Sequence, residues 1–215
     1  MKEKVIESIE KNKLIVIMRD IPTERLLKTA EALMKGGIHL IEVTFNAKNR
    51  ETNFKTAECI NILSREYGDE LLVGAGTVLS TTQLEMAYQA GAKYCISPNV
   101  DSNVIAKAVD LKMVSIPGAL TPTEIQAENL YGADFVKLFP VTSLGVGYIK
   151  AVKAPLSHIK FLAVGGITVN NLKSYLDIGV SGVGVGGNLV NKELIMNGKF
   201  DDITTLAKQY TKQIL

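Results

Sequence analysis

Residues 121–140 read TPTEIQAENLYGADFVKLFP, and this stretch holds the start of a helix, its end and a complete strand. The run Thr121–Glu124 has the capping-box pattern with proline at the first helical position, which predicts a helix start. Gly132 stands where the left-handed conformation that ends a helix is needed. The apolar run Ala133–Phe139 then predicts a buried strand. The stretch is therefore a helix followed by a strand, which is the repeating unit of a parallel sheet.

The same unit recurs along the chain. Apolar runs bounded by turn residues predict eight strands, at Leu14–Arg19, Ile38–Phe45, Leu71–Ala75, Ala92–Ser97, Lys112–Ile116, Ala133–Phe139, Lys160–Val164 and Val180–Gly184. Helical patterns follow them, and glycines precede several strands as helix stops, as at Gly36–Gly37, Gly91 and Gly179. Eight such units predict an α/β protein, one (β/α)8 TIM barrel that forms a single domain over residues 1–215. A doubly wound open sheet is the alternative, but it usually has fewer strands.

Both ends of the chain are predicted to be helical. Residues 1–13 form a helix that could plug the bottom of the barrel, and Phe200–Leu215 is the closing helix. A second capping-box pattern, at Ser80–Gln83, marks another helix start.

Composition favours a protein that acts on small molecules. The 215 residues are 47% hydrophobic with a formal net charge of +2, so a full core can form, and no basic run with interleaved aromatic residues points to nucleic acid or to a membrane. No apolar stretch resembles a signal peptide or a membrane span, which predicts a cytoplasmic protein. Cys59 and Cys95 lack a CxxC partner, and His39 and His158 lack zinc-ligand spacing, so we expect no disulfide and no metal site.

Lys137 is the unusual residue of the strand Ala133–Phe139, because lysine is almost never buried without a partner. Burial lowers the pKa of an amine, and the uncharged amine can attack a carbonyl to form a Schiff base. Strand alternation points Lys137 into the barrel, and the same alternation along Ile38–Phe45 points Glu42 inward as an acid/base partner. On position alone, a lysine whose head reaches water is about equally plausible, and a carboxylate that only neutralises the amine is the structural alternative.

Other polar residues stand at the carboxyl ends of the predicted strands, where barrel enzymes carry their chemistry. Arg19 could clamp a carboxylate or phosphate, or form only an ion pair at the rim. Thr77 could hold a carboxylate, or cap a helix. Gly165–Gly166 and Gly186–Gly187 end two strands where barrels often bind phosphate through backbone N–H groups, although a tight turn explains either pair alone. Thr168 and Asn188 could add donors there.

Six motifs, in this order, resemble one known family. They are Gly36–Gly37 with Ile41–Thr44, Val73–Val78, Ile96–Pro98, Ile116–Gly118, Val136–Pro140 and Val164–Ile167. The chain is similar over nearly its whole length to the class I 2-keto-3-deoxy-6-phosphogluconate (KDPG) aldolases, a group that includes the 6-phosphogalactonate and 4-hydroxy-2-oxoglutarate aldolases. Order and spacing make the resemblance specific, although each motif alone would not be.

The resemblance implies a homotrimer of (β/α)8 subunits that needs no cofactor. It implies that Lys137 forms an imine with pyruvate or a 2-keto acid and that Glu42 is the general acid/base. The residues implied to contact the substrate are Arg19, Thr77, Pro98 and Phe139, and those implied to bind its phosphate are Gly165, Gly166, Gly186 and Gly187.

Three positions depart from the KDPG aldolase pattern. Asn46 stands where arginine is often found and Val164 where threonine is found, and both resemble the phosphogalactonate branch; Asn188 replaces a common serine in the phosphate region. Asn46 cannot form a bidentate ionic contact to a carboxylate, and Val164 cannot hydrogen-bond a substrate hydroxyl. Weak discrimination between the C4 epimers is therefore expected.

These observations predict a class I aldolase that cleaves a 6-phosphorylated 2-keto-3-deoxy acid to pyruvate and glyceraldehyde 3-phosphate. A phosphate-binding barrel isomerase and a non-catalytic sensor of sugar phosphates are the alternatives. Neither gives a role to Lys137, Glu42 and Thr77 at three strand ends.

Overall fold

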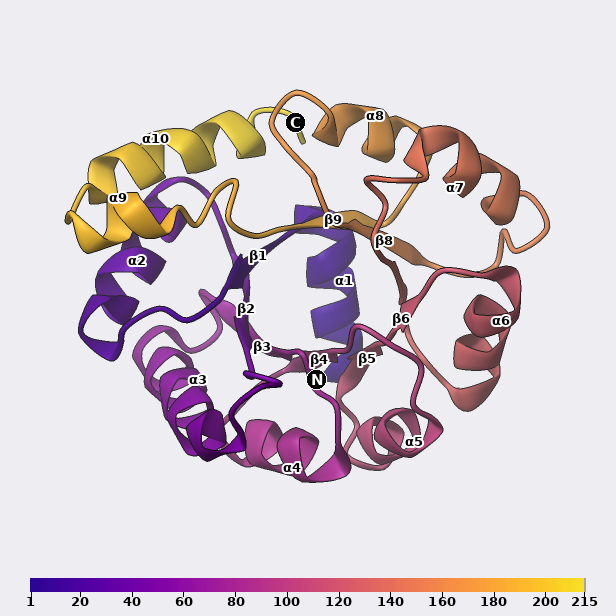
Figure 1. Ribbon diagram of the computed structural model, residues 1–215, viewed down its shortest axis with the longest axis horizontal. Coiled ribbons are helices and arrows are strands. Elements are labelled where there is room, and N and C mark those ends of the chain that lie inside the picture. The colour runs from indigo at the N-terminus through magenta and orange to yellow at the C-terminus, as the bar shows by residue number, and fades with distance from the viewer. Residues whose placement is uncertain (215) are drawn as a thin grey trace.

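A ring of parallel strands surrounded by helices forms the protein (Figure 1). The computed structural model describes residues 1–214. The strands are β1 (Leu14–Met18), β2 (Leu40–Thr44), β3 (Leu72–Gly76), β4 (Tyr94–Ile96), β5 (Val114–Ile116), β6 (Gly118–Ala119), β7 (Val136–Leu138), β8 (Phe161–Val164) and β9 (Gly182–Val185). From β1 the ring runs through β2, β3 and β4 to β5 on one side, and through β9, β8 and β7 to β6 on the other. The predicted TIM barrel is confirmed.

The fifth strand differs from the prediction, and it accounts for nine strands where eight are expected. The sequence predicts one strand over Lys112–Ile116, whereas the structure has β5 paired with β4 and β6 paired with β7, on either side of Pro117. Proline has no N–H group to continue a ladder, so the chain changes partners there. The amide of Lys137 donates to the carbonyl of Pro117 at 2.8 Å, which joins β7 to this bend and closes the ring.

In the described part of the chain nine α-helices surround the ring, and one, α1, crosses one end of it (Figure 1). The helices are α1 (Lys2–Asn12), α2 (Thr23–Lys35), α3 (Asn53–Tyr67), α4 (Thr81–Gln89), α5 (Ser102–Asp110), α6 (Pro122–Tyr131), α7 (Gly145–Lys153), α8 (Leu172–Asp177), α9 (Lys192–Met196) and α10 (Phe200–Thr211), and η1 (Arg50–Thr52) is a 3-10 turn. Of the predicted closing helix, Leu215 lies outside the described residues. No helix in residues 1–214 is both long enough and apolar enough to cross a membrane.

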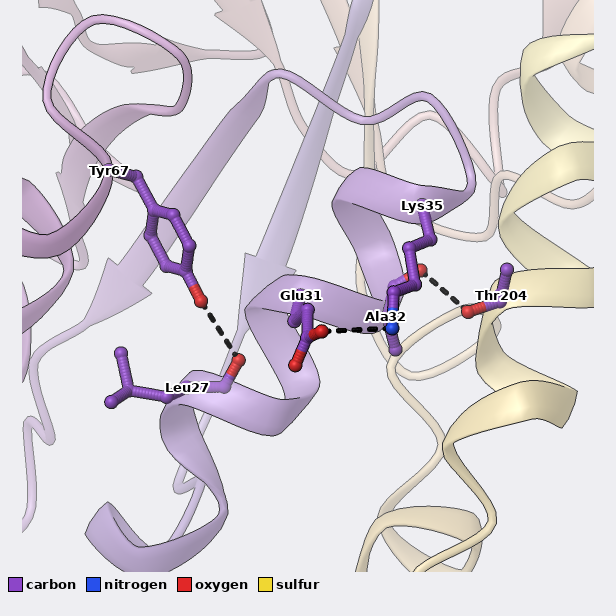
Figure 2. A network of polar contacts seen from close by, with 6 residues as sticks. All are labelled: Leu27, Glu31, Ala32, Lys35, Tyr67 and Thr204. Carbon is purple, nitrogen blue, oxygen red and sulfur yellow. Dashed lines mark hydrogen bonds and ion pairs between the residues drawn. The ribbon is translucent and has the colours of Figure 1, made fainter.

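Hydrogen bonds between side chains and backbone tie the outer helices together around α2 (Figure 2). Figure 2 shows Thr204 of α10 donating to the carbonyl of Ala32 at 2.8 Å and Tyr67 of α3 donating to the carbonyl of Leu27 at 3.2 Å. The last helix therefore packs beside the first outer helix, as a closed barrel requires.

The N-terminal helix closes the barrel at the amino ends of the strands, as predicted. Val5, Ile6 and Ile9 are buried in a cluster with interior residues such as Leu40 and Phe135. Ion pairs hold the helix in place on the rim of the same end: Lys2 to Asp134 at 2.9 Å, and Glu10 to Lys160 at 3.0 Å. The opposite end of the barrel is left as the mouth.

Strand alternation divides the residues of β2 and β7 as the sequence predicts. Ile41, Val43, Val136 and Leu138 belong to the cluster between the barrel and its outer helices. Their neighbours Leu40 and Phe135 belong to the interior cluster. Because successive side chains of a strand point to opposite faces, Glu42 and Lys137 point into the barrel.

The predicted helix boundaries follow from local hydrogen bonds. Thr121 and Glu124 form the full capping box, and Gly132 ends that helix with φ 98°. Ser80 accepts a hydrogen bond from the amide of Gln83, but the Gln83 side chain accepts from the amide of Leu79 at 2.7 Å rather than from that of Ser80. The second capping box is therefore present in a shifted form.

Candidate active site

Lys137 lies in β7 near the mouth of the barrel, and only 7% of the residue is exposed. Burial lowers the pKa of the Lys137 amine; the nearby charge of Glu42 opposes this shift, and that of Arg19 adds to it. The amine nitrogen lies 4.7 Å from the centre of the Phe139 ring. Among the described residues no carboxylate comes within ion-pair distance of Lys137. The direction of this shift favours the uncharged amine, which is the form a nucleophile needs.

Glu42 lies in β2 and is 2% exposed. Burial raises the pKa of its carboxyl, and the positive charges of Lys137 and Arg19 oppose the rise. The pKa values of Glu42 and Lys137 therefore move toward each other from their ordinary positions. Shifts in these directions make proton exchange between an amine and a carboxyl easier, as general acid/base catalysis requires.

A cavity of about 490 Å³ opens at the ends of β8, β9 and β1. Lys137 and Glu42 do not line it themselves, but Phe139, whose ring lies against the Lys137 amine, does. The polar side chains of the cavity come from Arg19, Asp20, Asn188 and Lys192. Its lining also includes Phe139, Val164 and the four glycines noted in the sequence, Gly165, Gly166, Gly186 and Gly187. The structure therefore brings together in one cavity the four glycines and Asn188 that the sequence assigns to phosphate binding, whereas Thr168 does not line it.

The two glycine pairs serve this cavity for different reasons. Gly165 and Gly166 have positive φ angles of 104° and 70°, so their backbone itself favours glycine. Gly186 and Gly187 have no positive φ, and a side chain at Gly187 would meet no atom within 4 Å. Glycine at this second pair leaves open space and exposes backbone N–H groups, which suits an anion.

Asn188 braces the loops of this cavity. Its side-chain amide donates to the carbonyl of Ile167 at 2.8 Å, so that donor joins the loop after β9 to the loop after β8. Lys192, by contrast, was missed by sequence reasoning although it lines the same cavity. The available signal was its place as the first cation after Gly187.

Pro98 and Phe139 line a second cavity, of about 380 Å³, together with Asn99 and Gly118. Phe139 borders both this cavity and the one beside Arg19, and it is 37% exposed. Because the Lys137 amine lies against its ring, Phe139 forms a wall between the two spaces next to the amine.

Thr77 and Asn46 lie elsewhere at the mouth. Thr77 follows β3 with φ 55°, and the alternative that it caps a helix is wrong, because Ser80 caps α4. Asn46 lines a separate cavity of about 290 Å³ between β1, β2, α2 and α3, which it shares with Thr44. Its side-chain oxygen accepts from the amide of Lys48 at 2.9 Å. The structure therefore does not bring Asn46 into the glycine-lined cavity.

Fold and site together define the class of protein. A TIM barrel with an inward lysine and glutamate at its mouth, and a glycine-lined cavity beside them, is the arrangement of a lyase that works through a Schiff base.

Comparison with known proteins gives the family. The model described as "Aldolase: KDPG and KHG aldolase" matches residues 5–206, and the chain belongs to this family. A 2-dehydro-3-deoxy-6-phosphogalactonate aldolase of Escherichia coli (strain K12) is 37% identical over 202 residues, which cover 94% of this chain and 96% of that protein. A 2-dehydro-3-deoxy-phosphogluconate aldolase of Treponema pallidum (strain Nichols) is 33% identical over 213 residues, covering 98% and 97%.

A solved structure supports the same assignment. The KDPG aldolase of Legionella pneumophila, with pyruvate captured as a covalent carbinolamine intermediate, superposes with a TM-score of 0.85 at 28% identity, over 97% of each chain. The resemblance to the KDPG aldolases seen in the sequence is thereby confirmed, and the chain is a class I aldolase.

Proposed function

We propose that the protein cleaves a 6-phosphorylated 2-keto-3-deoxy sugar acid, reversibly, to pyruvate and glyceraldehyde 3-phosphate. The observation that carries the proposal is the pair formed by Lys137 and Glu42. Both are buried at the barrel mouth, burial lowers the pKa of the first and raises that of the second, and a glycine-lined cavity lies beside them. The names of the relatives agree with this reaction.

The chemistry begins at the amine. Uncharged Lys137 adds to the C2 carbonyl to give a carbinolamine. Protonated Glu42 gives its proton to the C2 hydroxyl, which leaves as water, so that an iminium ion and the Glu42 carboxylate remain. Glu42 as carboxylate takes the proton of the C4 hydroxyl, the C3–C4 bond breaks, and its electrons move into the iminium to give an enamine and the free aldehyde. Protonated Glu42 returns its proton to C3 and becomes a carboxylate again. Water then hydrolyses the new iminium, which releases pyruvate and the uncharged amine, and the Glu42 carboxylate takes up the proton set free in this step. Atoms and protons balance without a further reactant.

The two ends of the substrate use different parts of the mouth. The phosphate is held by the backbone N–H groups of the four glycines, with Arg19 and Lys192 as the cations of that cavity. The pyruvate end lies against Phe139 and Pro98, which share a cavity. Its carboxylate is held by Thr77, as the family resemblance implies.

The site discriminates weakly between the gluconate and galactonate epimers. Val164 lines the cavity and offers no hydrogen bond to a C4 hydroxyl. The shorter 4-hydroxy-2-oxoglutarate is cleaved to pyruvate and glyoxylate more slowly, because it has no phosphate to fill the glycine-lined cavity. We place the reaction in the cytoplasm and in a homotrimer, as the sequence and the family resemblance predict.

Trapping with borohydride tests the proposal. Protein incubated with pyruvate and then reduced should carry a permanent added mass, and peptide mapping should locate it at Lys137. Lys137→Ala should show no adduct and no cleavage. Lys160→Ala is the matched control, because Lys160 also lies near an aromatic ring, 5.6 Å from the centre of Phe135, but at the closed end of the barrel.

Each alternative outcome has a defined meaning. An unlabelled wild-type protein that isomerises sugar phosphates would replace the aldolase with a barrel isomerase. Binding of sugar phosphates without pyruvate release in a single turnover would replace it with a sensor.

A further inference from the structure

Strand β3 presents glycine rather than a side chain to the interior at two successive inward positions. Val73 and Ala75 face the outer helices, so Gly74 and Gly76 face into the barrel. Neither glycine has a positive φ, so the backbone does not require glycine at either position. The reason for these glycines therefore lies in what occupies the space above them.

The Glu42 side chain occupies the space of a side chain at Gly76. A Cβ built on Gly76 would lie 1.6 Å from Oε1 of Glu42, 2.3 Å from Cδ and 2.5 Å from Cγ. Real Cβ atoms essentially never come within 3.0 Å of another atom. The carboxyl of Glu42 thus lies directly against the β3 backbone, and any larger residue at Gly76 would move it.

The Tyr94 ring fills the corresponding space at Gly74. A Cβ on Gly74 would lie 2.0 Å from Cε2 of the ring, which is fully buried. The Tyr94 hydroxyl donates to the carbonyl of Ile41 at 2.6 Å, and Ile41 immediately precedes Glu42. The strand register also aligns Glu42, Gly74 and Tyr94 across three neighbouring strands. Tyr94 therefore supports the part of β2 that carries Glu42.

We propose that Gly76 is a positioning residue that fixes the Glu42 carboxyl in the place from which it exchanges protons with the substrate held at Lys137. This inference rests on the proposed aldolase function. The physical reason is that proton transfer requires hydrogen-bond reach, so a displacement of about 1 Å can cost about a hundredfold in rate.

A stability cycle tests the contact itself. Gly76→Ala should lower the unfolding temperature in the wild-type background and should have much less effect in Glu42→Ala, because the truncated residue 42 leaves room for the new methyl group. Gly74→Ala is the matched control: its methyl group meets Tyr94, so Glu42→Ala should not relieve it. If Gly76→Ala fails to fold, the double variant should still fold. Equal losses from Gly76→Ala in both backgrounds, or a double variant that fails to fold, would overturn the inference.

A chemical assay tests positioning apart from folding. Pyruvate in D2O exchanges its methyl protons through the enamine, which requires the acid/base, whereas the extent of borohydride trapping after long incubation reports the imine equilibrium. Gly76→Ala should keep trapping within about twofold and lose about a hundredfold in exchange rate, as Glu42→Gln should also do. Wild-type exchange in Gly76→Ala, or loss of trapping together with exchange, would overturn the inference.

The two proposals fail differently. Absence of trapping in the wild-type protein would remove the proposed function. If trapping and exchange are normal in the wild type and exchange is unchanged in Gly76→Ala, the positioning role of Gly76 is contradicted and the proposed aldolase function stands.

Discussion

The two ends of the barrel interior are built from the same strands but differ in how they treat charge: one end is apolar with its charges paired at the rim, and the other buries charged groups without pairing them. At the closed end, Ile9 of α1 and Leu40 of β2 are completely buried among apolar neighbours, and the charges of that end, such as Lys2 and Asp134, are paired at the rim. At the mouth, Lys137 and Glu42 are buried and form no ion pair with any residue of 1–214, and glycine replaces side chains. Burial of unpaired charge is unfavourable, so the closed end supplies the stability that the mouth gives up for chemistry.

The largest effect is expected from the lysine at the mouth. Lys137→Met should lower kcat/KM at least about a thousandfold, because the imine cannot form. The same change should leave the free energy of unfolding unchanged or raise it by about 1 kcal/mol, because an apolar side chain replaces a desolvated amine. Steady-state cleavage and urea unfolding measure the two quantities. If the loss of unfolding free energy were as large as the loss of transition-state stabilisation calculated from kcat/KM, the difference between the two ends would be contradicted.

The reverse pattern is expected at the closed end. Ile9→Ala should cost about 4 kcal/mol of unfolding free energy, because it leaves a cavity between α1 and the barrel interior. The kcat/KM of the folded fraction should change by less than about twofold, since the mouth lies at the other end of the strands. Denaturant unfolding and a cleavage assay well below the transition check both values. If kcat/KM fell with stability, the two ends would be coupled.

A buried acid away from both ends sharpens the comparison. Glu128 on α6 is 0% exposed, and within the described residues no donor reaches either of its carboxyl oxygens. Burial, and then the charge of Glu124, raises the pKa of Glu128 from 4.5 to about 9. Between these two values the folded protein keeps a proton that the unfolded chain releases, so stability falls as pH rises, by up to about 1.4 kcal/mol per pH unit.

Glu128→Gln should remove this dependence. Its gain in unfolding free energy over the parent should be near zero at about pH 4 and about 3 kcal/mol at about pH 7. Urea unfolding across that range is the measurement, with exposed Glu58 as the control through Glu58→Gln. A gain that does not change with pH would show that Glu128 titrates normally. Unlike Glu42, Glu128 should affect stability without affecting kcat/KM.

The smallest effect is expected at the edge of the mouth. Lys192→Ala should raise KM for the phosphorylated substrate about fivefold, near 1 kcal/mol, because an exposed cation contributes modestly to holding a phosphate. The KM for 4-hydroxy-2-oxoglutarate, which has no phosphate, should not change. Lys199→Ala, a change at the next lysine along the chain, is the control. Equal changes in KM for both substrates would remove Lys192 from phosphate binding.

The sequence predicts the barrel because its signals are local. Capping patterns such as Thr121–Glu124 and helix stops such as Gly132 depend on neighbouring residues, and strand alternation alone directs Lys137 and Glu42 inward. The change of strand partners at Pro117 depends instead on how β4 and β7 meet around the ring, and no local pattern contains that information.

The site was predictable where residues follow strand ends and unpredictable where two elements meet. The four glycines and Arg19 share a cavity because parallel strands end at the same face. Asn46 also follows a strand end, yet its loop carries it between α2 and α3 into another cavity. Gly76 reads as an ordinary turn glycine in the sequence, since its contact with Glu42 depends on side chains from two strands.

The position of α1 determines which end of the barrel faces a support or a fusion partner joined to the N-terminus. Met1 is 88% exposed and immediately precedes α1, the helix at the end of the barrel opposite the mouth. A tether at the N-terminus would therefore leave from the closed end. Molecules immobilised on a bead or an electrode through this terminus would turn their mouths toward the solution, and an N-terminal fusion partner would not obstruct the approach of substrate.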